Sequence, residues 1–202
     1  MILHGSRPSL HPMNVEETDV PMPSADSSQR GLGWLLRPLR LKNCRGPWHF
    51  ILLLSVQNLA ANVIVAGPLY FLTPDGHHPA ADADFSMTHD LWRAAIAMVV
   101  IAPVFETLFL QAAPIELARA LRQSRWVQFL LGVIPFAALH FPMGIKVGIA
   151  AGIVSGMFLS HAYLEGRTCS AWSAFWITMV IHVIHNLICV GILFFAVWGV
   201  SQ

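Results

Sequence analysis

Charged residues are scarce in this chain. Asp, Glu, Lys and Arg together make up 11% of the 202 residues, whereas 55% are hydrophobic. The mean hydropathy of +0.59 is far from that of an ordinary soluble domain. The formal net charge is only +1, so no global attraction to nucleic acid is expected. The composition therefore predicts a membrane protein whose immediate surroundings are the lipid bilayer.

Cysteine is also rare. Cys44, Cys169 and Cys189 show no metal-type spacing, and their odd number argues against a disulfide framework. We therefore expect three free thiols and no cysteine zinc site.

The first 46 residues differ from the rest of the chain. Residues 1–30 mix proline with Ser, Asp and Glu, which is typical of a disordered segment. A basic start, an apolar core and a small-residue cleavage site are all missing there, so no signal peptide is expected. Residues 31–46 combine Trp34 and several leucines with four basic residues, as in a stretch that lies on an anionic leaflet. We interpret residues 1–46 as a disordered, basic juxtamembrane tail that precedes a transmembrane domain at 47–202.

Five apolar segments follow this tail. Most are near or above the roughly 20 residues that a helix needs to cross the hydrocarbon core. They lie at about 47–72, 91–119, 126–141, 144–164 and 171–198. The predicted fold class is therefore all-α, a polytopic transmembrane helical bundle with about five spans and no visible repeat. The third segment is short and needs shielding by its neighbours or a thinner bilayer.

The basic residues predict an orientation. If the N-terminus is cytoplasmic, ten of the twelve Lys and Arg residues lie on the cytoplasmic side, and only Arg93 and Lys146 lie outside. The segment 73–90 contains four aspartates and no Lys or Arg. Since loops rich in Lys and Arg stay in the cytoplasm, this asymmetry favours N-in and C-out.

Polar side chains inside the apolar segments converge on one depth. Glu106 is the one acidic residue deep in a segment, where a carboxylate costs about 3 kcal/mol on insertion scales. At 1.5 Å per residue from the basic end of each helix, Glu106, His140 and His182 lie about 20, 22 and 18 Å deep. Three helices are thus expected to bring a carboxylate and two imidazoles to one level.

The last apolar segment carries more than one polar group. His182 and Asn186 are four residues apart and share a helix face, with His185 on its flank. An isolated intramembrane His or Asn is commonly a hydrogen-bonding link between helices, and Gln57, Asn58 and Asn62 are interpreted in that way. A different interpretation applies to the polar residues that share one depth, Glu106, His140, His182 and Asn186. A carboxylate beside an imidazole can activate water, and a second imidazole with an amide can stabilise an oxyanion. These four residues favour a buried reaction centre.

Three motifs carry a family resemblance. They are "ETLFLQ" from Glu106 to Gln111, "FAALH" from Phe136 to His140, and "HVIHN" from His182 to Asn186. In this order and spacing they resemble the CPBP family of intramembrane proteases, named for CAAX proteases and bacteriocin-processing enzymes, with its type II CAAX prenyl endopeptidase-like members. The resemblance covers about residues 90–195. It implies hydrolysis of peptide bonds inside the membrane by a glutamate-activated water, without a cofactor, on a membrane-embedded peptide or protein.

The resemblance also implies roles for single residues. Glu106 and His140 would activate the water, and His182 and Asn186 would form the oxyanion site. His185 is not part of this carry-over; because it lies on the flank of the face shared by His182 and Asn186, we expect it to orient a neighbour or line the cavity.

The first motif departs from the family pattern at two supporting positions. Thr107 stands where the family usually has a second Glu, and Gln111 stands where it has Arg. Because both partners of a charge pair are lost together, the net charge of the site stays balanced. Gln111 can serve only as a neutral hydrogen-bond partner. This departure weakens the expectation that prenylated CAAX termini are the substrate.

Two alternatives to the protease stay open. One is a non-enzymatic membrane protein: a degenerate scaffold, an immunity-type protein or a proton-linked carrier. The other is a zinc hydrolase that uses the same carboxylate and imidazoles, although no HExxH helix supports it. We rank them protease, scaffold, zinc hydrolase. The absence of an organelle-targeting pattern, together with the resemblance, favours a bacterial cytoplasmic membrane.

Overall fold

The computed structural model describes Leu41 and residues 46–72 and 88–200. Apart from Leu41 and Gly46, the predicted N-terminal tail lies outside the described residues. Every element within the described ranges is a helix. Five helical stretches are long and apolar enough to cross a membrane: Trp48–Leu69, Trp92–Ala120, Arg125–Met143, Ile145–Gly166 and Ala171–Ile192. The predicted all-α class with five spans is confirmed.

Short π-helical segments interrupt the second span. It comprises α3 (Thr88–Ile96), η2 (Ala97–Ile101), α4 (Ala102–Glu106), η3 (Thr107–Ala112) and α5 (Ala113–Ala120). Both π-helical segments, η2 and η3, are followed by an Ala-Pro pair, with Pro103 and Pro114 near the start of the next α-helix. A proline ring clashes with the carbonyl four residues before it, and the wider π turn moves that carbonyl away.

The third span is longer than predicted. Helix α6 (Arg125–His140) starts at a Ser124 N-cap and continues into the single 3₁₀ turn η4 (Phe141–Met143). The span therefore covers 19 residues rather than the predicted 126–141. The added turn brings its length close to what the hydrocarbon core requires.

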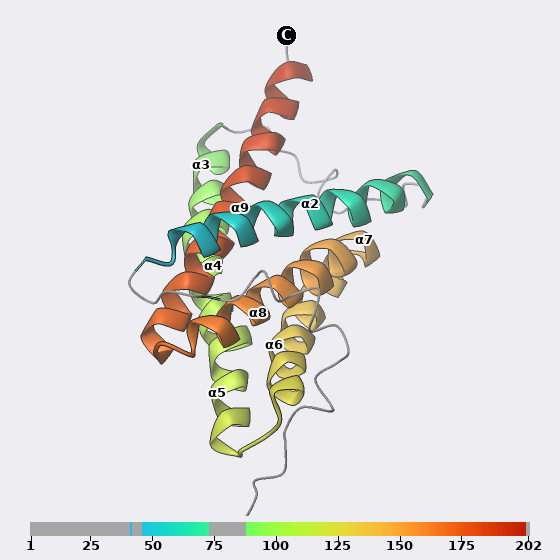
Figure 1. The fold of residues 1–202 in the computed structure, drawn as a ribbon. Helices are drawn as coiled ribbons and strands as arrows, with labels where there is room; N and C mark the ends of the chain where they lie inside the picture. The colour runs from blue at the N-terminus through green and yellow to red at the C-terminus, as the bar shows by residue number, and fades with distance from the viewer. Residues whose placement is uncertain (1–40, 42–45, 73–87, 201–202) are drawn as a thin grey trace, which may run out of the picture. The chain divides into compact units, whose positions relative to one another are not determined.

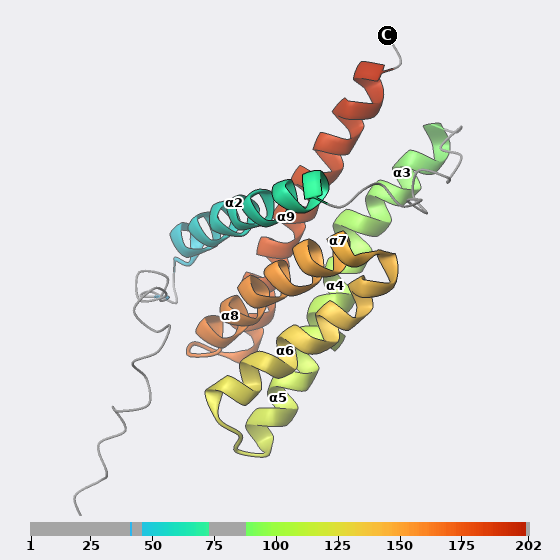
Figure 2. The same cartoon turned by 90° about the vertical axis from the view of Figure 1, so that its right-hand side faces the viewer.

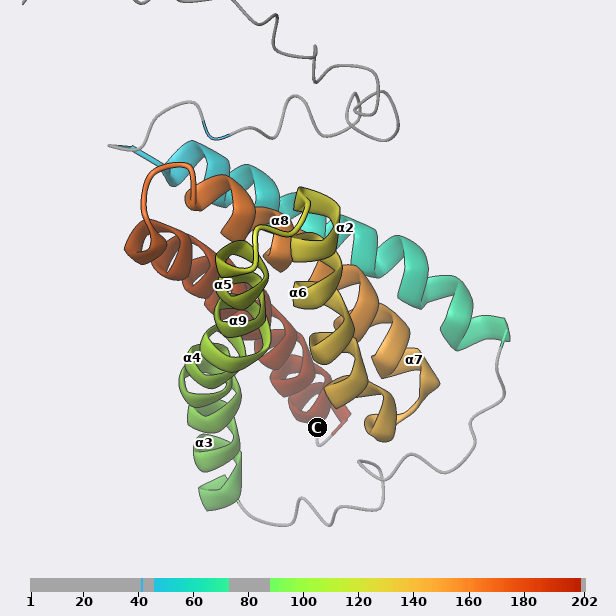
Figure 3. The same cartoon turned by 90° about the horizontal axis from the view of Figure 1, so that it is seen from below.

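The remaining elements make up the first, fourth and fifth spans, and the first span packs on the fourth and fifth (Figures 1 and 2). These elements are α2 (Trp48–Leu72), α7 (Ile145–Val147), η5 (Gly148–Ser155), α8 (Gly156–Gly166) and α9 (Ala171–Val200). Helix α6 contacts α5 on one side and η5 and α8 on the other, as Figure 3 shows from below. Helix α9 contacts α8, α2 and the second span around α4. Helix α4, which carries Glu106, thus adjoins α9, which carries His182, while α6 meets the second span through η3 and α5.

The first span is linked to the fourth through polar side chains. Asn62 Nδ2 donates to Ser155 Oγ at 3.0 Å and also to the Asn58 side-chain oxygen at 2.9 Å. Both asparagines are buried. The interpretation of Asn62 as an interhelical hydrogen-bonding residue is confirmed.

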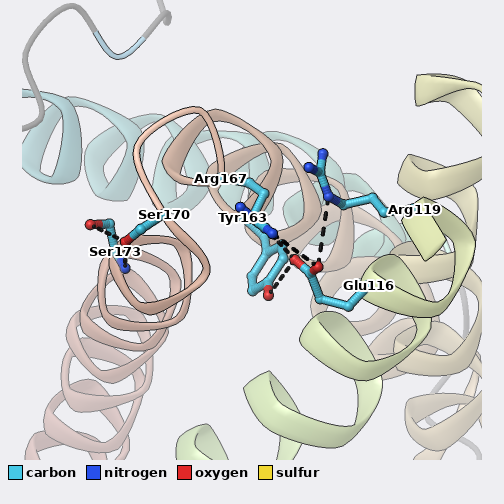
Figure 4. A network of polar contacts seen from close by, with 6 residues as sticks. All are labelled: Glu116, Arg119, Tyr163, Arg167, Ser170 and Ser173. Atoms are coloured by element: carbon cyan, nitrogen blue, oxygen red, sulfur yellow. Dashed lines mark hydrogen bonds and ion pairs between the residues drawn. The ribbon is translucent and has the colours of Figure 1, made fainter. Parts of the chain in front are cut away.

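The partly buried carboxylate of Glu116 connects α5 to the end of α8 (Figure 4). Glu116 Oε1 accepts hydrogen bonds from Tyr163 Oη at 3.1 Å and from Arg167 Nε at 2.6 Å. Arg119 Nε lies 3.7 Å from the other carboxylate oxygen. The hydrogen bond to Glu116 raises the pKa of the Arg167 guanidinium, which stays charged. This network holds the second span to the turn between the fourth and fifth spans.

The turn from α8 into α9 is tightly packed. Ser170 caps α9, since its Oγ accepts from the Ser173 backbone N–H at 2.9 Å. At Gly166, an added Cβ would lie 2.7 Å from the Ala174 Cα, which is backbone and cannot move aside. Gly166 is therefore required for the close approach of the two helices.

Gly166→Ala is expected to lower the free energy of unfolding by about 1–3 kcal/mol, because the new methyl group overpacks a rigid contact. The matched control is Gly191→Ala in α9, where an added Cβ meets nothing within 4 Å. Thermal unfolding of both variants in detergent measures the difference. Equal midpoints for the two variants would contradict the contact.

The prediction of three free thiols is wrong for Cys169, which is disulfide-bonded. Cys189 is free, as predicted, and Cys44 lies outside the described residues. Spacing along the chain carries no signal for a bond between distant cysteines, because the fold alone decides which ones meet.

Candidate active site

Glu106 of the second span and His182 of the fifth span face each other. Glu106 is the last residue of α4, and His182 lies near the middle of α9. Their Oε2 and Nε2 atoms are 3.5 Å apart, and the side chains are 18% and 4% exposed. This separation is longer than a good hydrogen bond, so neither group saturates the other. Both remain able to bind a third group in a water-poor environment.

His140 approaches the pair from the end of α6. Its Nδ1 lies 2.8 Å from the Phe136 carbonyl oxygen. A carbonyl can only accept, so Nδ1 carries the hydrogen and Nε2 of the neutral ring is left as an acceptor. The His140 ring is close enough to the Glu106 carboxylate for the two groups to interact electrostatically. His140 thus offers a basic nitrogen beside the carboxylate.

The ring of Phe136 packs against the imidazoles of both His140 and His182. It stacks on His140 with centroids 4.6 Å apart and meets His182 edge-on at 5.6 Å. The Phe136 side chain is only 1% exposed. Because buried aromatic rings pack in defined geometries, Phe136 restricts how either imidazole turns.

Asn186 lies one turn beyond His182 on α9. Its Nδ2 donates to the Met98 carbonyl oxygen in η2 at 2.8 Å. This bond fixes which end of the amide faces the second span, since a carbonyl oxygen cannot donate. The second hydrogen on Nδ2 is left for another acceptor. Asn186 is half-buried at the junction of the second and fifth spans.

The supporting positions Thr107 and Gln111 are fully buried in η3. Gln111 Oε1 accepts from Ser160 Oγ on α8 at 2.8 Å. Within the described part of the chain, Thr107 Oγ1 and Gln111 Nε2 have no hydrogen-bond partner. Gln111 therefore connects the second span to α8 rather than to the Glu106 carboxylate.

The contact between Gln111 and Ser160 requires a small residue on α6. An added Cβ at Gly132 would lie 2.4 Å from Ser160 Oγ and 3.0 Å from Gln111 Oε1. Sequence reasoning missed Ser160, because a serine in a Gly-rich apolar helix gives no signal of its partner.

The side chain of His185 faces Cys189, whereas that of His182 faces Glu106. His185 is buried, and its Nε2 lies 3.6 Å from Cys189 Sγ on the same helix. It is also close enough to His182 for the two imidazoles to interact electrostatically. The structure thus places His185 beside the Glu106–His182 pair rather than in it.

Among the described residues, no group of three or more His, Cys, Asp or Glu side chains is arranged to hold a metal ion. The arrangement instead offers a carboxylate, an acceptor nitrogen on His140, and donors on His182 and Asn186. Such a set can take a proton from water and stabilise negative charge on oxygen.

One family model matches the chain. It describes proteins as type II CAAX prenyl endopeptidase Rce1-like, and it matches residues 88–188, half of the sequence. Every candidate site residue lies within this range. No curated protein and no solved structure matches the chain.

Proposed function

The chain belongs to the type II CAAX prenyl endopeptidase Rce1-like family, and from this membership we propose a peptidase that hydrolyses peptide bonds inside the membrane with a glutamate-activated water. The family is a protease family, and the five apolar helices make the chain a multi-pass membrane protein. The observation that carries the proposed mechanism is the approach of Glu106 Oε2 to His182 Nε2, 3.5 Å apart in the protein interior.

Water activation is assigned to Glu106 and His140. The Glu106 carboxylate accepts a proton from water as the oxygen attacks the peptide carbonyl carbon. The free Nε2 of His140 accepts a hydrogen bond from the same water, since its Nδ1–H is held by Phe136. The protonated Glu106 then gives its proton to the leaving nitrogen as the C–N bond breaks. One water is consumed, and a carboxylic acid and an amine are formed.

Stabilisation of the tetrahedral intermediate is assigned to His182 and Asn186. Both side chains lie on one face of α9, and each has an N–H that no strong hydrogen bond occupies. Fixed donors in a water-poor site stabilise developing charge without reorganising. Thr107, Gln111 and His185 support the geometry without touching the substrate.

The proposed substrate is a membrane-embedded peptide or protein. The family description points to prenylated CAAX termini, whereas Thr107 and Gln111 depart from the expected charged pair. A neutral glutamine cannot hold a carboxylate as a guanidinium does. We therefore propose that unmodified transmembrane peptides are cleaved as well. The N-terminus is proposed to be cytoplasmic, in a bacterial cytoplasmic membrane.

The test is cleavage by protein purified in detergent. Two probes are compared: a farnesylated peptide with a CAAX terminus and a library of unmodified transmembrane peptides, with products identified by mass spectrometry. Cleavage of either probe by the wild type, and its loss in Glu106→Ala, is the expected result. A well-folded wild type that cleaves neither probe would contradict the proposal and favour the scaffold.

A further inference from the structure

The Met98 carbonyl lacks its usual donors within the helix. In an α-helix the Ala102 N–H would bond to Met98, but here it donates to the Ala97 carbonyl at the end of η2. In a continued π turn the donor would be residue 103, which is proline and has no N–H. Both routes by which the helix normally satisfies this carbonyl are therefore closed.

The amide of Asn186 takes the open position. Its Nδ2 donates to the Met98 oxygen at 2.8 Å, from a different span 88 residues later in the chain. Met98 lies within an apolar span, where a carbonyl has no water to bond to, so this bond is favoured once Pro103 has removed the helical donor. It sets the plane of the amide, and the direction of the second N–H follows from that plane.

We propose that Pro103 is a positioning residue that orients Asn186. By withholding an N–H, Pro103 leaves the Met98 carbonyl to hold one hydrogen of the Asn186 amide, and the other hydrogen is thereby aimed at the intermediate. This inference rests on the proposed function. In the proposed arrangement neither Pro103 nor Met98 contacts the substrate, and both act through Asn186.

Replacing Pro103 gives the carbonyl a competing donor. Both Pro103→Ala and Pro103→Val carry an N–H, and valine keeps more of the apolar volume of this fully buried residue. A backbone donor in the same helix then competes with Asn186 for the Met98 oxygen. The amide loses its anchor while the donor itself stays in place.

The chain offers a matched control in the same span. Pro114 follows η3 as Pro103 follows η2, and the Ala113 N–H donates to Leu108 in the same π pattern. It lies about 16 Å further along the helix, at 1.5 Å per residue, outside the candidate site. Pro114→Ala therefore reports the general effect of restoring an N–H to a π-interrupted span.

The experiment measures kcat and KM separately for these variants, on whichever of the farnesylated CAAX peptide and the transmembrane library peptides the wild type cleaves. Pro103→Ala and Pro103→Val are expected to lower kcat by about tenfold or more with KM nearly unchanged, since a misplaced group costs rate. Pro114→Ala is expected to stay within about twofold of the wild type. Thermal unfolding in detergent confirms that each variant is folded.

A double-mutant cycle separates positioning from general damage. In an Asn186→Ala background, Pro103→Ala is expected to cost almost nothing more, because the group it positions is gone. Full additivity of the two substitutions, or equal kcat for Pro103→Ala and Pro114→Ala, would overturn the inference while wild-type cleavage still supports the proposed function. Absence of cleavage by the wild type would instead contradict the proposed function itself.

Discussion

Glu106→Gln is expected to lower the cleavage rate by about 10³-fold or more. Glutamine keeps the size and shape of the side chain but cannot accept a proton from water. General base catalysis supplies about 10²- to 10⁴-fold in rate, and no other carboxylate in the described residues faces His182. Because the Glu106 side chain is only 18% exposed, bulk water cannot readily replace it as a base. The initial rate of cleavage of the transmembrane peptide library measures the loss.

A glutamate in the same span serves as the matched control. Glu116 lies ten residues beyond Glu106 and bonds to Tyr163 and Arg167 rather than to an imidazole. Glu116→Gln is expected to weaken that network and lower the unfolding midpoint, yet to leave the chemistry of the folded protein intact. If Glu106→Gln cleaves at the rate of Glu116→Gln, Glu106 is not the base.

His182→Ala is expected to lose about 10²- to 10³-fold in kcat, the loss typical of removing one oxyanion donor. His182 is 4% exposed, lies 3.5 Å from the Glu106 carboxylate and packs against the edge of Phe136. Its removal takes away a donor to the intermediate and also a neighbour of the base. Single-turnover kinetics with excess enzyme measures the chemical step without product release.

His185→Ala is the control for loss of an imidazole from the same helix. His185 is also buried, but its Nε2 faces Cys189 rather than Glu106. Its replacement is expected to change kcat far less than His182→Ala, with both variants folded to a similar degree. An equal loss from the two substitutions would redraw the site around His185, and a fully active His182→Ala would remove His182 from it.

The membrane fold was predictable because hydropathy and helix length decide it. The segments predicted around Glu106 and His182 correspond to Trp92–Ala120 and Ala171–Ile192 in the structure. The π-helical interruptions were not predicted, since an Ala-Pro pair in an apolar helix is also compatible with a simple kink. The 3₁₀ extension after His140 was missed because Phe141 and Pro142 look like the end of a helix.

The site could be predicted only as far as residue type and depth reach. Glu106, His140 and His182 were predicted to lie at one depth, and in the structure α4 contacts α9, while Phe136 of α6 meets His182 of α9. The partners of the predicted residues were invisible. Asn186 bonds to a backbone carbonyl and Gln111 to Ser160, and such contacts depend on how the helices cross rather than on a residue pattern. The assigned roles stay predictions.

In the proposed peptidase a glutamate activates the water without a metal ion. The most direct measurement is cleavage of the transmembrane peptide library by purified wild-type protein and by Glu106→Ala, each with and without a strong chelator. We expect the wild type to cleave at the same rate with and without chelator, and Glu106→Ala not to cleave in either condition. Loss of wild-type cleavage on chelation, with recovery when zinc is restored, would contradict this expectation and establish the zinc hydrolase instead.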